Sequence, residues 1–332
     1  MLIVTVKPRA DALTRVEYAV ERGVRAFRVN FARRAIGENV ALLEAIGDVA
    51  IRRGAELEFW IDLPGPKARL GEFANESEFL SLGRRFIIYP GAERLGDADG
   101  AGLDDVALFD RLESGDTVIV ADGAVHLTVN ARSESTVECE VAKAGRVHAR
   151  CGVVAPRRYV ANRALTRDDR VVAVVAARLA THVCASFVDS PQVVHDVRAA
   201  VGPGLGIVAK IESPIGVAAG EALAAVADGL VLARGDLRAF YSDREMRRIA
   251  SQLKRHSTHH GAQLVLASNY FRGLSQTGVL TADERDEILW ALALSPEYLM
   301  INETSHSPHW RAVVDAAVDL WPRDRRVASV SA

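Results

Sequence analysis

Residues 206–237 read GIVAKIESPIGVAAGEALAAVADGLVLARGDL and show the repeating unit of this chain. The apolar run at 206–210 predicts a buried strand, and a short helix is expected near 216–225. The apolar run at 228–233 predicts the next strand. The first strand ends at Lys210, and Arg234 directly follows the second. Two strands joined by a helix predict a parallel βα unit.

The same unit extends from this stretch in both directions. Apolar runs of strand length also lie at 2–6, 25–30, 57–61, 182–186, 263–267 and 298–302. Helical spacing or helix-start signals predict helices at 11–22, 37–53, 166–179, 190–200, 242–260, 282–293 and 309–321. Eight strand–helix units predict an α/β protein with a (β/α)8 TIM barrel. A doubly wound open sheet is the main alternative, but no GxGxxG turn follows the early strands.

The alternation is interrupted between residues 73 and 157. This segment contains short β-rich runs separated by Gly, Asp, Asn and Ser turns, without a long helical pattern. It predicts a small all-β lid domain inserted after barrel strand 3. A packed structural insertion is the alternative. We therefore expect a barrel at 1–72 and 158–322, a lid at 73–157 and a tail at 323–332.

Composition excludes several classes of protein. The 332 residues include 41 Lys and Arg against 43 Asp and Glu, for a net charge of -2, so neither nucleic acid nor a membrane is an expected partner. Only five of the 41 basic residues are lysines. The three cysteines show neither disulfide nor zinc spacing, and no signal peptide or apolar membrane span is evident. We expect a cytoplasmic protein.

Polar side chains end or directly follow nearly every predicted strand. In chain order they are Arg28, Asn30, Asp62, Ser186, Lys210, Glu212, Arg234, Asp236, Ser268, Asn269, Asn302 and Glu303. Because barrel active sites form at the C-terminal strand ends, these side chains should meet at one mouth. Two carboxylates can hold Mg2+, and Arg and Lys suit a phosphate or carboxylate substrate. Solvated salt bridges at the barrel rim are the alternative.

Several motifs resemble the pyruvate kinase family in the correct order over roughly residues 1–310. The strongest are AKIESPIGV (209–217) and DGLVLARGDL (228–237). FRVNFARR (27–34), DLPGPKARLG (62–71), IVADGAVHLTV (119–129), CASFV (184–188) and LMINET (299–304) are similar to further family segments. The resemblance implies a Mg2+- or Mn2+-dependent phosphotransferase that acts on phosphoenolpyruvate, pyruvate or a close enolpyruvyl analogue with ADP or ATP.

The resemblance also implies roles for individual residues. Lys210 and Arg28 would neutralise and grip the transferring phosphoryl group, and Ser268 would act in protonation of the enolate. Glu212 and Asp236 would bind the divalent metal. The remaining assignments are substrate binding by Ser186 and by backbone N–H groups of Gly235 and Asp236, and nucleotide binding by Asn30 and Arg69. Lys67 would replace a monovalent cation, so no potassium requirement is expected.

The chain departs from the family pattern at Ala32, Arg33, Cys151, Arg238 and segment 279–283. The sequence also stops where the family continues into a C-terminal regulatory domain, so allostery through that domain is not expected. Two alternative functions follow: a C–C lyase or aldolase of the pyruvate-enolate type, and a catalytically impaired ligand-binding paralogue. Trp310 and Trp321 could mark a face for homo-oligomer formation or pack on the barrel.

Overall fold

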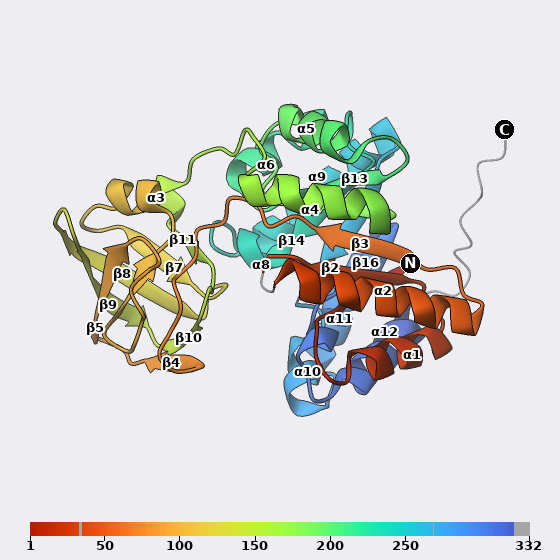
Figure 1. Ribbon diagram of the computed structural model, residues 1–332, viewed down its shortest axis with the longest axis horizontal. Coiled ribbons are helices and arrows are strands. Elements are labelled where there is room, and N and C mark those ends of the chain that lie inside the picture. Colours follow the sequence, from red (N-terminus) through yellow and green to blue (C-terminus); the bar gives the residue numbers. More distant parts are fainter. Residues whose placement is uncertain (33–34, 268, 322–332) are drawn as a thin grey trace.

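The computed structural model, which describes residues 1–32, 35–267 and 269–321, contains a closed barrel of eight parallel strands (Figure 1). Around the barrel the strands follow the order β1, β16, β15, β14, β13, β12, β3 and β2. Their bounds are β1 Leu2–Val6, β2 Ala26–Asn30, β3 Glu58–Asp62, β12 His182–Ala185, β13 Gly206–Ile211, β14 Gly229–Ala233, β15 Gln263–Ala267 and β16 Tyr298–Ile301. The predicted TIM barrel is therefore confirmed, and each strand lies within two residues of its predicted ends.

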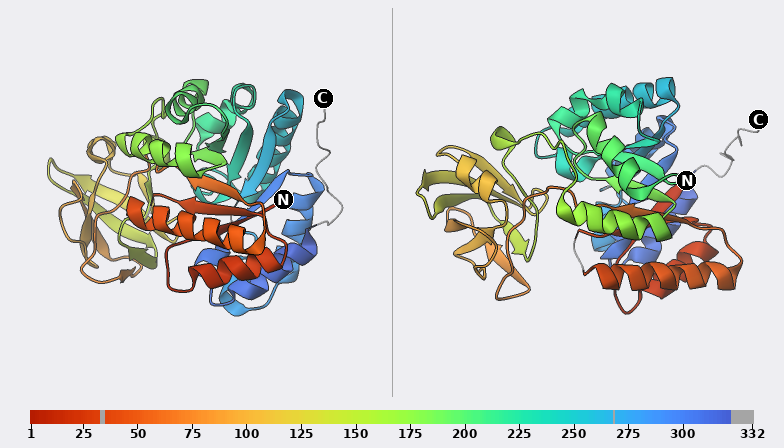
Figure 2. Two further views of the ribbon diagram at one scale, coloured as in Figure 1. Left: turned by 45° about the vertical axis from the view of Figure 1, so that its right-hand side comes forward. Right: turned by 45° about the horizontal axis from the view of Figure 1, so that its top comes forward.

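Helices surround the barrel and cover its strands (Figures 1 and 2). The long ones are α1 Ala12–Glu21, α2 Ile36–Arg53, α4 Arg167–Leu179, α5 Pro191–Val201, α9 Asp243–His260, α11 Ala282–Ala293 and α12 Trp310–Leu320. Shorter helical segments are α6 Pro214–Ala218, α7 Gly220–Ala224, α8 Arg234–Leu237, α10 Arg272–Thr277, η1 Pro156–Arg158 and η2 Glu303–Ser305. The single helix expected near 216–225 is thus two short helices.

The caps explain where several helices begin. Thr166 accepts the Asp169 N–H while the Asp169 carboxylate accepts the Thr166 N–H, which forms the capping box of α4. Asp11 occupies the N-cap position of α1, and aspartate is a common N-cap residue, but its side chain makes no capping hydrogen bond. Its carboxylate instead accepts hydrogen bonds from Arg15, at 3.0 and 2.8 Å. Arg15, four residues further along the chain, therefore binds the Asp11 carboxylate in place of the backbone N–H groups that a cap would satisfy.

The chain between β3 and β12 carries a second β structure, which we call the insertion and which lies beside the barrel in Figure 1. Its six-stranded sheet has the order β11, β7, β8, β9, β5, β6, and β10 pairs with β4. The strand bounds are β4 Ser77–Leu80, β5 Arg85–Pro90, β6 Gly100–Leu103, β7 Thr117–Val120, β8 Val125–Arg132, β9 Val137–Lys143, β10 Gly145–His148 and β11 Val153–Val154. The insertion also contains one short helix, α3 Val106–Arg111.

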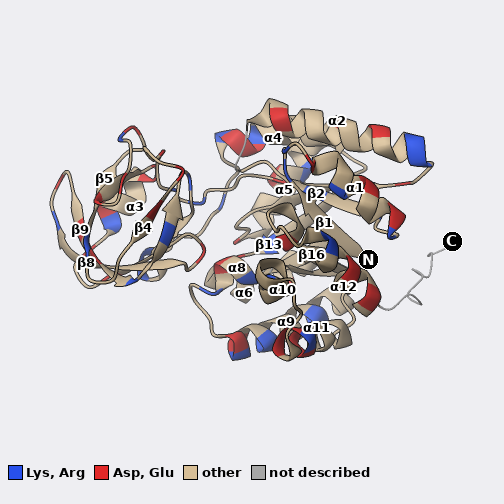
Figure 3. Cartoon of the chain, turned by 90° about the horizontal axis from the view of Figure 1, so that it is seen from below, with Lys and Arg blue, Asp and Glu red and all other residues tan. Residues whose placement is uncertain are grey.

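Separate hydrophobic clusters fill the two parts of the chain. The cluster of the insertion includes buried residues from Ala68 to Ala155, whereas another lies between the barrel strands and the surrounding helices. Trp310 belongs to the latter and packs edge-on against Tyr18, with ring centroids 5.3 Å apart. The sequence left two possibilities for Trp310, a self-association face or packing on the barrel, and the structure shows the side chain packed on the barrel. Acidic and basic residues are interspersed over both parts (Figure 3).

Candidate functional site

The ammonium group of Lys210 lies at the centre of a charged network at the barrel mouth. Lys210 is the last residue but one of β13. Its Nζ lies 3.1 Å from Asp62 Oδ2, 2.9 Å from Glu212 Oε1 and 3.1 Å from Ser186 Oγ. Burial opposes the charge on Lys210, but Asp62 and Glu212 more than offset it and raise the lysine pKa. The amine is therefore held as a fixed, nearly buried cation facing the mouth.

Asp62, at the end of β3, joins Lys210 to Arg28. Arg28 donates from Nε to Asp62 Oδ1 at 2.8 Å and from Nη2 to Asp62 Oδ2 at 2.5 Å. Its Nη1 donates to Asn302 Oδ1 at 2.8 Å and to Thr5 Oγ1 at 3.1 Å. Burial favours the neutral acid, but Arg28 and Lys210 hold the pKa of Asp62 well below its usual range. A single buried carboxylate thus orients both predicted phosphoryl-binding cations.

Glu212 follows β13 and is almost fully buried. Its Oε2 accepts the N–H of Phe187 at 2.7 Å, while Oε1 faces Lys210. Phe187 has a positive φ of 51°, which is unusual for a residue with a side chain and aims its N–H at the carboxylate. Burial raises the pKa of Glu212 to about 7, and the nearby charge of Asp236 adds to the rise.

Asp236 lies in α8, directly after β14, and is half-buried. Its carboxylate interacts with that of Glu212 and accepts a hydrogen bond from Lys67 Nζ at 2.5 Å. Two adjacent carboxylates are a suitable donor set for a hard divalent cation. Among the residues with described positions, no three His, Cys, Asp or Glu side chains gather as a possible metal site. Substrate oxygens and water would have to complete the coordination sphere.

Other predicted site residues occupy more local roles. Ser186 Oγ donates to the carbonyl oxygen of Leu63 at 2.8 Å, beside Lys210. Asn30 Oδ1 accepts the N–H of Ala32 at 2.8 Å and so stabilises the turn after β2. Arg69 is buried, and its Nη1 donates to the carbonyl oxygen of Arg150 at 3.1 Å. Gly235 lies in the first turn of α8, whereas Ser268 is outside the described residues.

Four groups that the structure brings to the site had no function predicted from the sequence, namely Asp62, Asp122, Asn302 and Glu303. Asp62 was placed at the mouth without a function. Asp122 lies in the turn after β7 and accepts a hydrogen bond from Lys67 at 2.8 Å, and Asn302 binds Arg28. Glu303 is a further buried carboxylate, which accepts the N–H groups of Phe271 and Asn302 and holds the loop after β15. The position of Glu303 directly after a predicted strand was the only sign in the sequence that it lies near the site.

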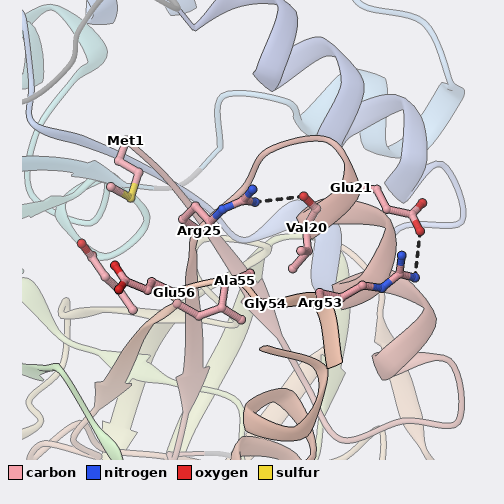
Figure 4. A pocket seen from close by; sticks show the side chains of 10 residues that line it. Met1, Val20, Glu21, Arg25, Arg53, Gly54, Ala55 and Glu56 are labelled. Carbon is pink, nitrogen blue, oxygen red and sulfur yellow. Dashed lines mark hydrogen bonds and ion pairs between the residues drawn. The ribbon is translucent and has the colours of Figure 1, made fainter. Parts of the chain in front are cut away.

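A cavity of about 760 Å3 lies at the opposite end of the barrel, before β1, β2 and β3 (Figure 4). Its charged side chains mostly have local partners. Arg25 donates to the carbonyl oxygen of Val20 at 2.9 Å, and Arg53 pairs with Glu21 at 2.9 Å. Because barrel enzymes use the other end of their strands, the network around Lys210 is the candidate active site.

Fold and site together define a TIM-barrel protein with a buried lysine, paired carboxylates and an inserted β structure at its mouth. The family described as "Pyruvate kinase, barrel domain" matches residues 1–303. The chain belongs to the pyruvate kinase family.

Curated pyruvate kinases are among the similar proteins. That of Methylorubrum extorquens is 26% identical over 309 residues, covering 92% of this chain and 64% of the relative. That of Clostridium acetobutylicum is 30% identical over 241 residues, covering 71% and 51%. This chain therefore spans between half and two thirds of their lengths. A solved pyruvate kinase from Cryptosporidium parvum superimposes with a TM-score of 0.80 at 20% identity, over 96% of this chain and 68% of that one.

None of the helices within the described ranges is both long and apolar enough to cross a membrane. The three cysteines are buried free thiols, in agreement with the absence of disulfide spacing in the sequence.

Proposed function

We propose that this protein is a divalent-cation-dependent phosphotransferase that moves a phosphoryl group between an enolpyruvyl phosphate and an adenine nucleotide. The observation that carries the proposal is the Lys210 ammonium, held by Asp62, Glu212 and Ser186 next to the Glu212–Asp236 carboxylate pair. Phosphoryl transfer needs positioned positive charge rather than covalent chemistry from the protein, and this network supplies it.

Each group has a part in the proposed reaction. Lys210 and Arg28 balance the charge of the phosphoryl group as it leaves the enol oxygen and bonds to the nucleotide phosphate. Glu212 and Asp236 would hold Mg2+ or Mn2+, which when bound supplies a Lewis acid for the substrate oxygens. The hydroxyl of Ser268 is proposed to act in delivering a proton to the enolate.

The substrate carboxylate is assigned to Gly235 and Asp236, whose N–H groups lie in the first turn of α8. Ser186 supports this subsite through its contact with Lys210. Asn30 and Arg69 are assigned to the nucleotide phosphates. The local hydrogen bonds of both side chains mean that they would contact a nucleotide with their remaining donors or after a small rearrangement.

A coupled assay that measures pyruvate release from phosphoenolpyruvate and ADP with Mg2+ tests the function. Wild-type protein should turn over, and Lys210→Met should lose at least about a hundredfold in kcat, the usual effect of removing one charge-stabilising group. Lys254→Met is a matched control, because Lys254 pairs with Glu297 at the other end of the barrel. Absence of turnover with enolpyruvyl phosphates and with 2-oxo acids would refute the proposal.

Calorimetry distinguishes this function from an enolate-forming lyase. Binding of ADP or ATP in the presence of Mg2+ is expected for a phosphotransferase. Binding of oxalate, an enolate mimic, without any nucleotide binding would favour the lyase instead.

A further inference from the structure

Lys67 connects the barrel to the insertion through two carboxylates. Its Nζ lies 2.5 Å from Asp236 Oδ1 on the barrel and 2.8 Å from Asp122 Oδ1 on the insertion. Asp122 is held in the turn between β7 and β8 with a positive φ of 55°. The ammonium is therefore shared between one proposed cation ligand and one residue of the insertion.

Lys67 also lies where the chain passes from one part to the other. Just before it, Gly65 is fixed to the barrel, since its N–H donates to Asp169 Oδ1 at 2.8 Å. Just after it, Ala68 is buried in the cluster of the insertion and its carbonyl oxygen accepts the N–H of Val153. Only Pro66 and Lys67 separate these two anchors. If Lys67 exchanges one carboxylate partner for the other, the change therefore takes place at the junction between the barrel and the insertion.

The return crossing is equally short. Arg158 pairs with Asp116 of the insertion at 2.6 Å, whereas the hydroxyl of the next residue, Tyr159, donates to Asp189 of the barrel at 2.6 Å. Both connections therefore change from one part to the other within one or two residues.

The space around the ammonium is nearly filled. A Cβ on Gly152 would lie 2.1 Å from Lys67 Cε, so glycine is the residue that lets the lysine pass at this position. The crevice lined by Lys67, Asp122, Gly152 and Asp236 holds about 10 Å3 of free volume. That is about the minimum for one water molecule, so this crevice does not admit a hydrated cation while Lys67 is in place.

We propose that Lys67 competes with the divalent cation for Asp236, and that the displaced ammonium is retained by Asp122 of the insertion. The inference rests on the proposed cation site at Glu212 and Asp236. A cation and the ammonium on one carboxylate repel each other, so occupancy by one weakens the other. Asp122 offers the lysine a second carboxylate, which lowers the free-energy cost of its release. Cation binding and the link between insertion and barrel are then coupled, each acting on the other.

Titration with Mn2+ alone, followed by electron paramagnetic resonance without nucleotide or substrate, tests the competition. Lys67→Met should bind Mn2+ about tenfold more tightly than wild type, and Lys67→Gln, which keeps a polar end, should also bind it more tightly. Asp122→Asn should bind Mn2+ several-fold more weakly. Of the two carboxylates that hold Lys67, Asp236 alone would then remain, so the lysine would be harder to displace from it. Lys254→Met should match wild type. Thermal unfolding of every variant confirms that the fold is retained.

The outcomes separate this inference from the proposed function. Equal or weaker Mn2+ binding by both Lys67 variants would show that the lysine does not compete. Unchanged binding by Asp122→Asn would overturn the part assigned to the insertion. Absence of Mn2+ binding in wild type and in all variants would instead refute the cation site, and the proposed function with it.

Discussion

Replacing Asp62 by Asn tests whether one buried carboxylate holds the site together. Asp62 is fully buried and faces two cations, Arg28 and Lys210, which are 5% and 9% exposed. Arg28 donates hydrogen bonds to both carboxylate oxygens of Asp62. An asparagine keeps one acceptor oxygen, but its NH2 group would face an N–H donor of Arg28 in place of the other oxygen. The substitution therefore removes the shared counter-charge and creates one donor–donor contact.

The expected cost is about 3–5 kcal/mol in the free energy of unfolding, the usual result of removing one partner from a buried ion pair. That is a large part of the total stability of an ordinary domain, which is about 5–15 kcal/mol. Urea unfolding at neutral pH, followed by far-ultraviolet circular dichroism, measures the loss. Asp110→Asn is the matched control, since Asp110 pairs with Arg132 on the surface at 3.1 Å and should cost below about 1 kcal/mol.

A double-mutant cycle with Arg28→Met separates the pair from its surroundings. Once Asp62 is gone, removing the unpaired guanidinium should cost less than it does in wild type, so the two losses should be non-additive by at least about 1 kcal/mol. If Asp62→Asn cost no more than Asp110→Asn, or if the losses from Asp62→Asn and Arg28→Met simply added, Asp62 would not be the shared counter-charge of the site.

Three more changes test individual charges and contacts of the protein. Turnover should be unchanged when potassium is removed, because Lys67 keeps a positive charge at the mouth whether Asp236 or Asp122 holds it. A loss of activity in coupled assays without potassium would contradict this. Gly152→Ala should push Lys67 off the carboxylates and tighten Mn2+ binding, with a stability change of about 1 kcal/mol or less because a lysine end is flexible; unchanged binding would count against the packing argument. Burial lowers the pKa of His182 from its usual value of 6.5, so the contribution of the neutral ring to stability is complete above that pH and is lost as the pH falls through the folded-state pKa. His182→Phe should therefore flatten the fall of urea-measured stability below pH 6.5, by up to about 1.4 kcal/mol per pH unit. An unaltered slope would show that His182 is not the titrating group.

The barrel was predictable from the sequence because its signals are local. Each buried parallel strand appears as a short apolar run, and capping residues such as Thr166 mark the helix starts. The number and order of the units then predicted closure. The competition between Arg15 and a cap for Asp11 was not predictable, since both interactions use the same carboxylate and the sequence does not rank them.

The sequence predicted that Lys210, Glu212 and Asp236 share one mouth, but not the network of contacts around them. Placing polar residues at strand ends brought Lys210, Glu212 and Asp236 to one mouth, as barrel geometry requires. The part of Asp122 could not be found in this way. It lies 55 residues beyond Lys67, and the two meet only because the insertion folds its turn back toward the barrel. Contacts of this kind depend on how two separate cores are placed, which no local pattern encodes.

The charges of the site explain why its ligands should bind together. Three cations of the mouth, Arg28, Lys67 and Lys210, face four carboxylates, Asp62, Asp122, Glu212 and Asp236. The two signs of charge therefore nearly balance when all seven groups are ionised. A divalent cation alone would add positive charge beside Lys67, and a phosphorylated acid alone would add negative charge beside Glu212 and Asp236. When both are present their charges offset, so each should strengthen the binding of the other.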